Sequence, residues 1–160
     1  MTGAAQGLGQ AIALALAERG ARVIATDLAA PEETVRRIGP TAQTLPLDVS
    51  SDDDWRLVAE KSAELGPVDI VVNNAGFFPN RRIDDLDFPT WRKTMATDLD
   101  AHFLSAKHFL PAMRKGGWGN IASDSGPRLS ASQHGVAGMV SSAGGPISAG
   151  SARRGAPTRA

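Results

Sequence analysis

Cysteine and tyrosine are both missing from the 160 residues of this chain. Without cysteine, the chain has no disulfide framework and no thiolate metal site. Without tyrosine, it has no phenol to act as the acid or base of a reaction, a role that tyrosine side chains fill in some enzymes. Any proton transfer by this protein must therefore use another side chain.

An excess of charge is also missing, because 17 Lys and Arg residues balance 17 Asp and Glu residues. Bulk electrostatics therefore favour neither nucleic acid nor a membrane surface as a partner. The apolar run at residues 11–17 is short, rich in alanine and not preceded by a basic segment. It predicts neither a signal peptide nor a membrane span. We expect a soluble cytoplasmic protein with one domain large enough for a core.

A glycine-rich turn, Gly3-Ala4-Ala5-Gln6-Gly7-Leu8-Gly9, leads directly into an apolar helical segment at residues 10–18. Glycines allow a tight turn and the close approach of a ligand to the backbone. The N–H groups at the start of the helix suit a pyrophosphate. The spacing is G-x-x-x-G-x-G rather than the dinucleotide fingerprint G-x-G-x-x-G. Taken alone, a simple turn before an alanine-rich helix explains it equally well.

The next segment, residues 22–27, reads as a short buried strand that ends in the carboxylate of Asp27. Asp27 lies 18 residues after Gly9. This is near the separation of about 20 residues at which dinucleotide-binding folds place an acid on the ribose 2′-hydroxyl. A carboxylate there favours NAD and repels the additional phosphate of NADP. The alternative is a surface Asp that closes a strand.

Strands and helices continue to alternate along the chain. We expect a helix at 31–38, a strand at 43–47 that leads into Asp48-Val49, and a helix capped by Ser51. A buried strand at 68–72 then leads into Asn73-Asn74-Ala75-Gly76. This order predicts a doubly wound parallel sheet of α/β class, whose ligands lie beyond the carboxyl ends of the strands. Asp27, Asp48 and Asn74 would therefore line one crevice.

The acidic run at residues 52–54 is interpreted as a helix start, where carboxylates suit the helix dipole, and not as a metal site. A longer amphipathic helix is predicted over about 88–114, with Asp87 as its cap and Pro111 bending or shortening its end. His102 and His108 lie on it without metal-ligand spacing and are treated as ordinary helix residues. The stripe on this helix is interpreted mainly as core: Trp91, Met95, Leu99, Phe103, Ala106, Leu110 and Met113.

Four motifs in this order resemble the short-chain dehydrogenase/reductase family over roughly residues 1–140. The resemblance implies a Rossmann-like sheet and NAD-dependent interconversion of a small-molecule alcohol and a ketone or aldehyde. It also implies a homo-oligomer contact through the helix at about 88–114. The cofactor-binding residues that it implies hold the pyrophosphate (Gly3, Gln6, Gly7, Leu8, Gly9), the ribose (Asp27), the adenine (Asp48, Val49) and the nicotinamide half (Asn74, Ala75, Gly76).

The catalytic segment departs from the family pattern. Ser123 retains the position of the serine that holds the substrate oxygen, at the end of a short strand. Leu129 stands where the family has Tyr, Gln133 where it has Lys, and Asp98 where it has an Asn that supports a water relay. Leu has no ionisable group and Gln carries no charge. The alternative function is therefore a non-catalytic nucleotide-binding remnant, or a subunit that pairs with an intact relative.

Both ends also depart from the family pattern. The strand that precedes the glycine turn in the family is absent, and because that strand is central, two neighbours would face a gap with unpaired backbone groups. Residues 141–160 contain Ile147 as their only larger aliphatic side chain and are expected to form a disordered tail after a domain at 1–140. We expect a truncated or reading-frame-damaged gene copy, which resequencing of the locus would test.

Overall fold

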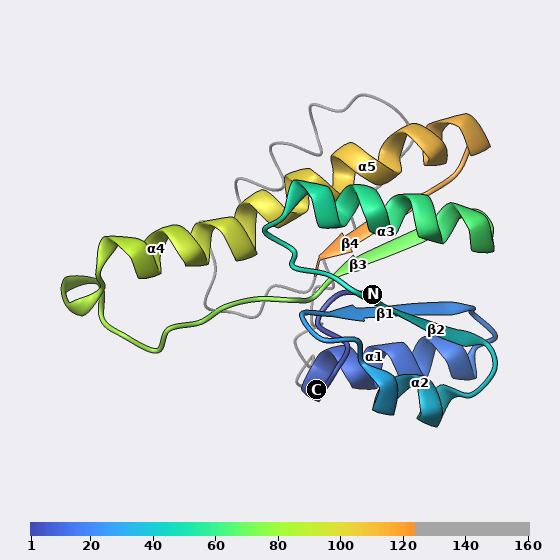
Figure 1. The fold of residues 1–160 in the computed structure, drawn as a ribbon, viewed down its shortest axis with the longest axis horizontal. Coiled ribbons are helices and arrows are strands. Elements are labelled where there is room, and N and C mark those ends of the chain that lie inside the picture. The colour runs from blue at the N-terminus through green and yellow to red at the C-terminus, as the bar shows by residue number, and fades with distance from the viewer. Residues whose placement is uncertain (124–160) are drawn as a thin grey trace, which may run out of the picture.

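The structure, a computed structural model, describes residues 1–123. Figure 1 shows strands alternating with helices along most of the described chain. The alternation predicted for residues 8–72 is confirmed, with small differences at the ends of the elements. In chain order they are α1 (Gly7–Glu18), β1 (Val23–Asp27), α2 (Glu32–Ile38), β2 (Ala42–Pro46), α3 (Asp52–Leu65), β3 (Ile70–Asn73), the 3₁₀ turn η1 (Ile83–Asp85), α4 (Phe88–Met95), the π-helical turn η2 (Ala96–Asp100), α5 (Ala101–Gly116) and β4 (Asn120–Ser123).

The strands form two parallel pairs that are joined at the start of the chain. β1 pairs with β2 and β3 pairs with β4, both in parallel register. Thr2 lies between the pairs: its N–H donates to the Val72 carbonyl at 3.0 Å, and it forms a parallel bridge with Thr26. The Thr26 N–H in turn donates to the Met1 carbonyl at 2.9 Å. The predicted parallel sheet of a Rossmann-like α/β fold is thus present in partial form.

A cavity of about 560 Å³ separates the two strand pairs beyond this junction, lined in part by Met1, Ile24 and Val72. The Val23 N–H points toward β2 and donates to the Thr41 carbonyl. Because successive N–H groups of a strand point in opposite directions, the N–H of Ile24 points toward the cavity. The Met1 amine donates to the Ile24 carbonyl at 3.0 Å, and burial lowers the pKa of this amine to about 6. The gap expected between two neighbouring strands is present.

Helices cover both faces of the strands, with α1 and α2 on one side and α3 and α5 on the other (Figure 1). The larger core lies under α3 and α5. Its centre is Trp55, which is 1% exposed, stands edge-on to the Phe109 ring at 6.2 Å and donates from Nε1 to the Val49 carbonyl at 2.8 Å. Alanines dominate the smaller core under α1, which lets that helix approach β1 closely: Ala4, Ala13, Val23, Ala25 and Ala42.

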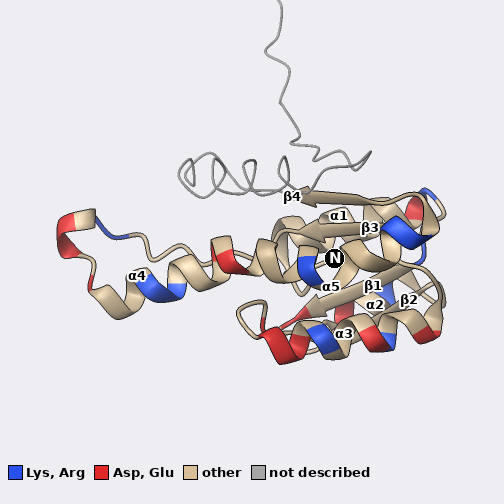
Figure 2. Ribbon diagram, turned by 90° about the horizontal axis from the view of Figure 1, so that it is seen from above, with Lys and Arg blue, Asp and Glu red and all other residues tan. Residues whose placement is uncertain are grey.

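The long helix predicted at 88–114 is interrupted. It consists of α4 and α5 joined by η2, and α4 projects away from the strands in Figures 1 and 2. Asp87 caps α4 as predicted, by accepting a hydrogen bond from the Thr90 N–H. Of the two effects expected of Pro111, the shortening of the helix is wrong, since α5 continues to Gly116, and the bend stays a prediction. Proline has no N–H group, so the Lys107 carbonyl loses its usual donor in the helix. Because Pro111 is exposed, water can donate to this carbonyl instead.

The apolar stripe on this helix does not form one continuous core face. Trp91 is 39% exposed and Phe103 is 53% exposed, so the interpretation of these two side chains as core is wrong. A π-helical turn holds an additional residue, which shifts the phase of the stripe between α4 and α5. The side chains that α5 buries in the larger core are those of Ala101, Leu104, Phe109 and Met113. Within residues 1–123, no helix is both long and apolar enough to cross a membrane.

The position of Trp55 predicts a strong effect of its substitution. Trp55→Phe removes the hydrogen bond to the Val49 carbonyl and leaves a small void, so we expect the free energy of unfolding to fall by about 1–3 kcal/mol. Urea unfolding measures this change. Trp118→Phe is the matched control, because Trp118 is 59% exposed and its substitution should change stability by less than about 0.5 kcal/mol. Equal losses in the two variants would contradict this description of the core.

Candidate functional site

The glycine turn has the geometry that its sequence suggests. Gly3 and Gly7 have φ angles of +64° and +58°, in the left-handed region that side chains disfavour. A Cβ atom on Gly9 would lie 1.9 Å from the Gly3 carbonyl oxygen, whereas a Cβ on Gly7 would meet no heavy atom within 4 Å. Gly9 therefore lets the turn pack against its helix, and the space beside Gly7 is open to a ligand.

The first turn of α1 is left without a cap. The Gln6 side chain makes no capping hydrogen bond, and no acidic residue lies in the first turn. In contrast, Ser51 caps α3 and Asp87 caps α4 with side-chain oxygens. Gln6, Gly7 and Leu8 are exposed. The N–H groups at this end and the positive end of the helix dipole are therefore available to an anion such as a pyrophosphate, so the residues present fit the dinucleotide.

Asp27 lies directly beside this turn, as the crevice hypothesis requires. Its Oδ2 accepts a hydrogen bond from the Ala5 N–H, and its Oδ1 accepts one from the Leu28 N–H, both at 2.9 Å. The carboxylate thus fastens the turn and brings a negative charge to the rim of the anion site. A second phosphate placed near Asp27 would be repelled.

Asn74 fastens the same turn from β3. Its Nδ2 donates to the carbonyls of Thr2 and Gly3 at 3.1 and 3.2 Å. The N–H groups of Asn74 and Ala75 both donate to Thr2 Oγ1 at 3.0 Å. The Asn74 side chain is therefore part of the scaffold that shapes the turn. Two residues further along the chain, Gly76 is exposed.

Of the two residues Asp48 and Val49 after β2, one is exposed and the other is buried. Val49 is buried, and its carbonyl accepts the hydrogen bond from Trp55. Asp48 is exposed, and its Oδ1 accepts hydrogen bonds from the N–H and hydroxyl groups of Ser50. Asp48 is thus held at the surface after the carboxyl end of β2. Asp27 ends the neighbouring parallel strand β1, so both lie at the same end of the strand pair.

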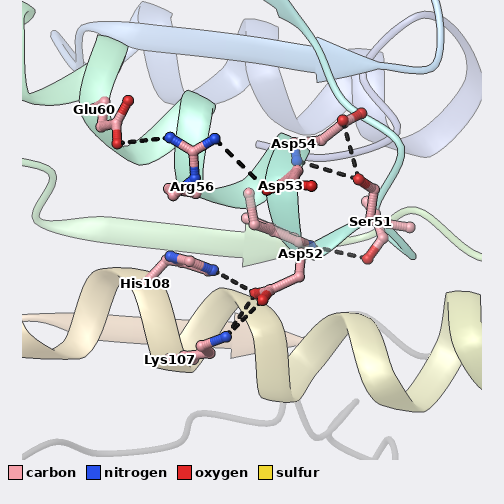
Figure 3. Close-up of polar contacts among 10 residues, drawn as sticks. Ser51, Asp52, Asp53, Asp54, Arg56, Glu60, Lys107 and His108 are labelled. Atoms are coloured by element: carbon pink, nitrogen blue, oxygen red, sulfur yellow. Dashed lines mark hydrogen bonds and ion pairs between the residues drawn. The ribbon is translucent and has the colours of Figure 1, made fainter.

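The acidic run after Ser51 begins α3, as predicted, and also connects two helices. Figure 3 shows Asp52 reaching α5, where its carboxylate contacts Lys107 Nζ at 2.6 Å and His108 Nε2 at 2.7 Å. The hydrogen bond from Lys107 is the main reason why the pKa of Asp52 is lowered from its usual value. Among the 123 described residues, no group of three or more potential ligands is arranged to hold a metal ion.

Asp98 lies in η2, and its side chain is buried. Its Oδ1 accepts a hydrogen bond from the Phe77 N–H at 2.8 Å, which ties the loop after β3 to the helix. Its Oδ2 has no hydrogen-bond partner within the described part of the chain. Burial raises the pKa of this carboxyl group, and the hydrogen bond from Phe77 opposes the shift only in part.

Ser123, the predicted catalytic serine, has a partner that the sequence analysis treats as an ordinary helix residue. His102 Nε2 lies 2.7 Å from Ser123 Oγ, between the buried face of α5 and the end of β4. Burial lowers the pKa of His102. No sequence signal indicated this contact, because His102 and Ser123 lie 21 residues apart on different elements. Leu129, Gln133 and the tail predicted at 141–160 lie outside the described residues.

The family profile described as short chain dehydrogenase matches residues 1–147 of this sequence. The chain belongs to the short-chain dehydrogenase/reductase family. Among curated relatives, a trans-4-hydroxycyclohexanecarboxylate dehydrogenase of Sinomonas cyclohexanicum is 35% identical over 140 residues, covering 79% of this chain and 54% of the relative. A D-beta-hydroxybutyrate dehydrogenase of Rhizobium meliloti is 32% identical over 158 residues, covering 88% of this chain and 61% of the relative.

Solved structures of the family match the fold as well. A metagenomic short-chain oxidoreductase in complex with NADP superposes with a TM-score of 0.80 at 30% sequence identity, covering 89% of this chain and 71% of that one. This short-chain dehydrogenase/reductase chain spans between half and two thirds of the length of the two curated relatives above. The glycine turn, β1 and β3 described above all fall within the matched residues.

Asp98 makes the stability of this short-chain dehydrogenase/reductase depend on pH. Because its folded pKa is raised above 3.8, the stability it contributes is present below pH 3.8 and is lost as the pH rises through the folded pKa. Asp98→Asn should therefore raise the free energy of unfolding at pH 7, and by less as the pH falls toward 4. Urea unfolding at the two pH values measures this difference. The exposed Asp100→Asn is the control, and an equal gain at both pH values would contradict the assignment.

Proposed function

We propose that this chain binds a nicotinamide dinucleotide across the carboxyl ends of β1, β2 and β3. The observation that carries the proposal is the uncapped start of α1, with open space beside Gly7 and the Asp27 carboxylate at its rim. The N–H groups around Gln6, Gly7 and Leu8 would hold the pyrophosphate. Gly3 and Gly9 would keep the turn in the shape that binds it, because a side chain at either position collides with the scaffold, and Gly7 would leave space for it.

The remaining roles follow from the order of the strands along the crevice. Asp27 would accept a hydrogen bond from the adenosine ribose, which favours NAD over NADP. Asp48 and Val49 would flank the adenine, Asp48 from the surface and Val49 through its backbone, since its side chain is in the core. Ala75 and Gly76 would face the nicotinamide half, while Asn74 holds the turn in shape.

The class of reaction proposed is the interconversion of a small-molecule alcohol and a ketone or aldehyde. A bound nicotinamide supplies or accepts the hydride in that chemistry. The Ser123 hydroxyl, at the end of β4, would hold the substrate oxygen. General acid–base help typically contributes about 10²- to 10⁴-fold to a rate, so a chain without tyrosine is expected to turn over slowly.

The second candidate function is nucleotide binding without turnover. It is favoured by Leu129 and Gln133, which carry no ionisable group at the positions where the family has Tyr and Lys. NADH production from a panel of secondary alcohols separates the two candidates. Turnover by the wild-type chain supports the first, and cofactor binding with no turnover supports the second. A cytoplasmic location stays a prediction under either one.

The preference for NAD predicts a selective thermal shift. A ligand at 100 times its dissociation constant stabilises the folded state by about 2.7 kcal/mol, so NAD should raise the melting temperature clearly and NADP weakly. Asp27→Asn keeps an oxygen for the Ala5 N–H but removes the charge, and should bring the NADP shift up to that of NAD. The control is Asp85→Asn, an exposed residue in η1. Equal shifts by NAD and NADP in the wild-type chain would contradict the role of Asp27.

The exposed apolar side chains of α4 and α5 support a homo-oligomer contact through this helix pair. Phe88, Trp91 and Phe103 are all exposed on it. Phe103→Lys should therefore reduce the molar mass measured by light scattering after size exclusion, whereas Leu57→Lys on exposed α3 should leave it unchanged. A wild-type chain that is monomeric at all concentrations, or a mass unaffected by Phe103→Lys, would contradict the contact.

A further inference from the structure

We propose that His102 is a positioning residue that exchanges a proton with the Ser123 hydroxyl, so that Ser123 gives a proton to the substrate oxygen or takes one from it. The inference rests on the proposed function, because it assigns the proton transfer of that reaction. It is needed because the chain contains no tyrosine to perform this step. The contact that carries it is the 2.7 Å separation of His102 Nε2 and Ser123 Oγ.

The surrounding structure fixes both groups. Ser123 is the last residue of β4 and pairs in register with Asn73 at the end of β3, so it lies at the crevice edge. The His102 backbone is linked to β3 through Ser105. Ser105 Oγ donates to the His102 carbonyl at 2.9 Å and accepts a hydrogen bond from Asn73 Nδ2 at 2.8 Å. The imidazole is 9% exposed and Ser123 is half-buried. Of the two residues, Ser123 is therefore the one that a substrate could reach more easily.

The charges near His102 suit an exchange at Nε2. Asp98, one turn earlier, directs its carboxylate to the Phe77 N–H, and its carbonyl weakly raises the pKa of His102. Lys107 and His108, further along α5, contact Asp52 on α3. Burial dominates and lowers the pKa of the ring, so His102 is neutral near pH 7. A neutral imidazole can accept the Ser123 proton at Nε2.

The proton count balances in both directions. When an alcohol is oxidised, its O–H proton passes to Ser123 Oγ while the Ser123 proton passes to His102 Nε2, and the C–O bond becomes C=O. The hydride acceptor in that direction is the oxidised nicotinamide dinucleotide of the proposed function. After alcohol oxidation, the imidazolium releases its Nε2 proton through Ser123 to water once the product has left. When a carbonyl is reduced, His102 first takes a proton from water by the same route, and the imidazolium then gives it through Ser123 to the substrate oxygen. The imidazolium exists only transiently, because its buried site disfavours the charge.

The first experiment tests the proton exchange without any cofactor. Nuclear magnetic resonance of ¹⁵N-histidine-labelled protein follows the titration and tautomer of His102, with His108→Gln and His134→Gln used to assign the signals of the three histidines. Ser123→Ala should move the His102 titration midpoint by about half a pH unit or more, and Ser123→Thr, which keeps a hydroxyl, should restore it. Identical His102 titrations in all three proteins would overturn the proposal.

The second experiment tests the consequence for reaction. The kcat/KM for ketone reduction with NADH should show a pH dependence whose midpoint matches the His102 titration. His102→Gln should abolish that dependence and lower kcat by about 10²-fold or more with little change in KM. His102→Asn provides a second variant in case the first does not fold, and His108→Gln is the matched control with an unchanged profile. An unchanged profile in the folded His102 variants would overturn the proposal.

The thermal shift caused by NADH, measured on the same proteins, separates cofactor binding from the proton exchange. A clear shift in a wild-type chain that does not turn over would overturn the proton exchange as a catalytic step and leave cofactor binding intact. No shift and no turnover would overturn the proposed function, and the catalytic part of this proposal with it. A coupled His102 and Ser123 titration together with the matching pH profile would support both.

Discussion

Thr2 and its neighbours hold the two strand pairs together, because the Met1 carbonyl and the Ala4 N–H bond to Thr26 of β1 while Thr2 itself bonds to β3. Its N–H bonds to β3 through Val72, it forms a bridge with β1 at Thr26, and its hydroxyl accepts the N–H groups of Asn74 and Ala75. Its carbonyl accepts from the Asn74 side chain, which also holds Gly3. The segment at residues 1–4 therefore connects the two strand pairs and, together with Asp27 and Asn74, holds the glycine turn. With a cavity of about 560 Å³ between the pairs, few other contacts can take over this role.

The parts of the fold that follow from short-range rules were predictable from the sequence. Ser51 and Asp87 cap helices because their oxygens satisfy nearby N–H groups, and the run at 68–72 forms a strand because its β-branched side chains fit a buried sheet. The π-helical turn at 96–100 was not predictable, since no residue type specifies it. It shifts the phase of the helix, so that Phe103 lies off the buried face of α5, whereas Trp91 is exposed because α4 projects away from the strands (Figure 1).

The candidate site shows the same division. The motif order placed Asp27 and the glycine turn together because strand ends of a parallel sheet meet at one edge. The structural work of Asn74 and of the Asp52 contact with α5 depends on pairs that lie far apart in the sequence, such as Asp52 and Lys107. The contact of His102 was not predictable for the same reason, because its partner Ser123 is 21 residues away on a strand. Long-range side-chain pairing has no periodic signal in a single sequence.

The two halves of the site differ in how well their buried polar groups are satisfied. Around the glycine turn, the amide of Asn74, the hydroxyl of Thr34 and the carboxylate of Asp27 all have partners. Three of the four buried side-chain atoms without partners in residues 1–123 instead lie where β3 meets η2 and α5: Asn73 Oδ1, Asp98 Oδ2 and His102 Nδ1. A buried unsatisfied group typically costs about 1–3 kcal/mol, so a fold keeps such groups together chiefly where chemistry uses them. Around the glycine turn these buried polar groups are therefore paired, whereas the region around Ser123 keeps three unpaired polar atoms within residues 1–123.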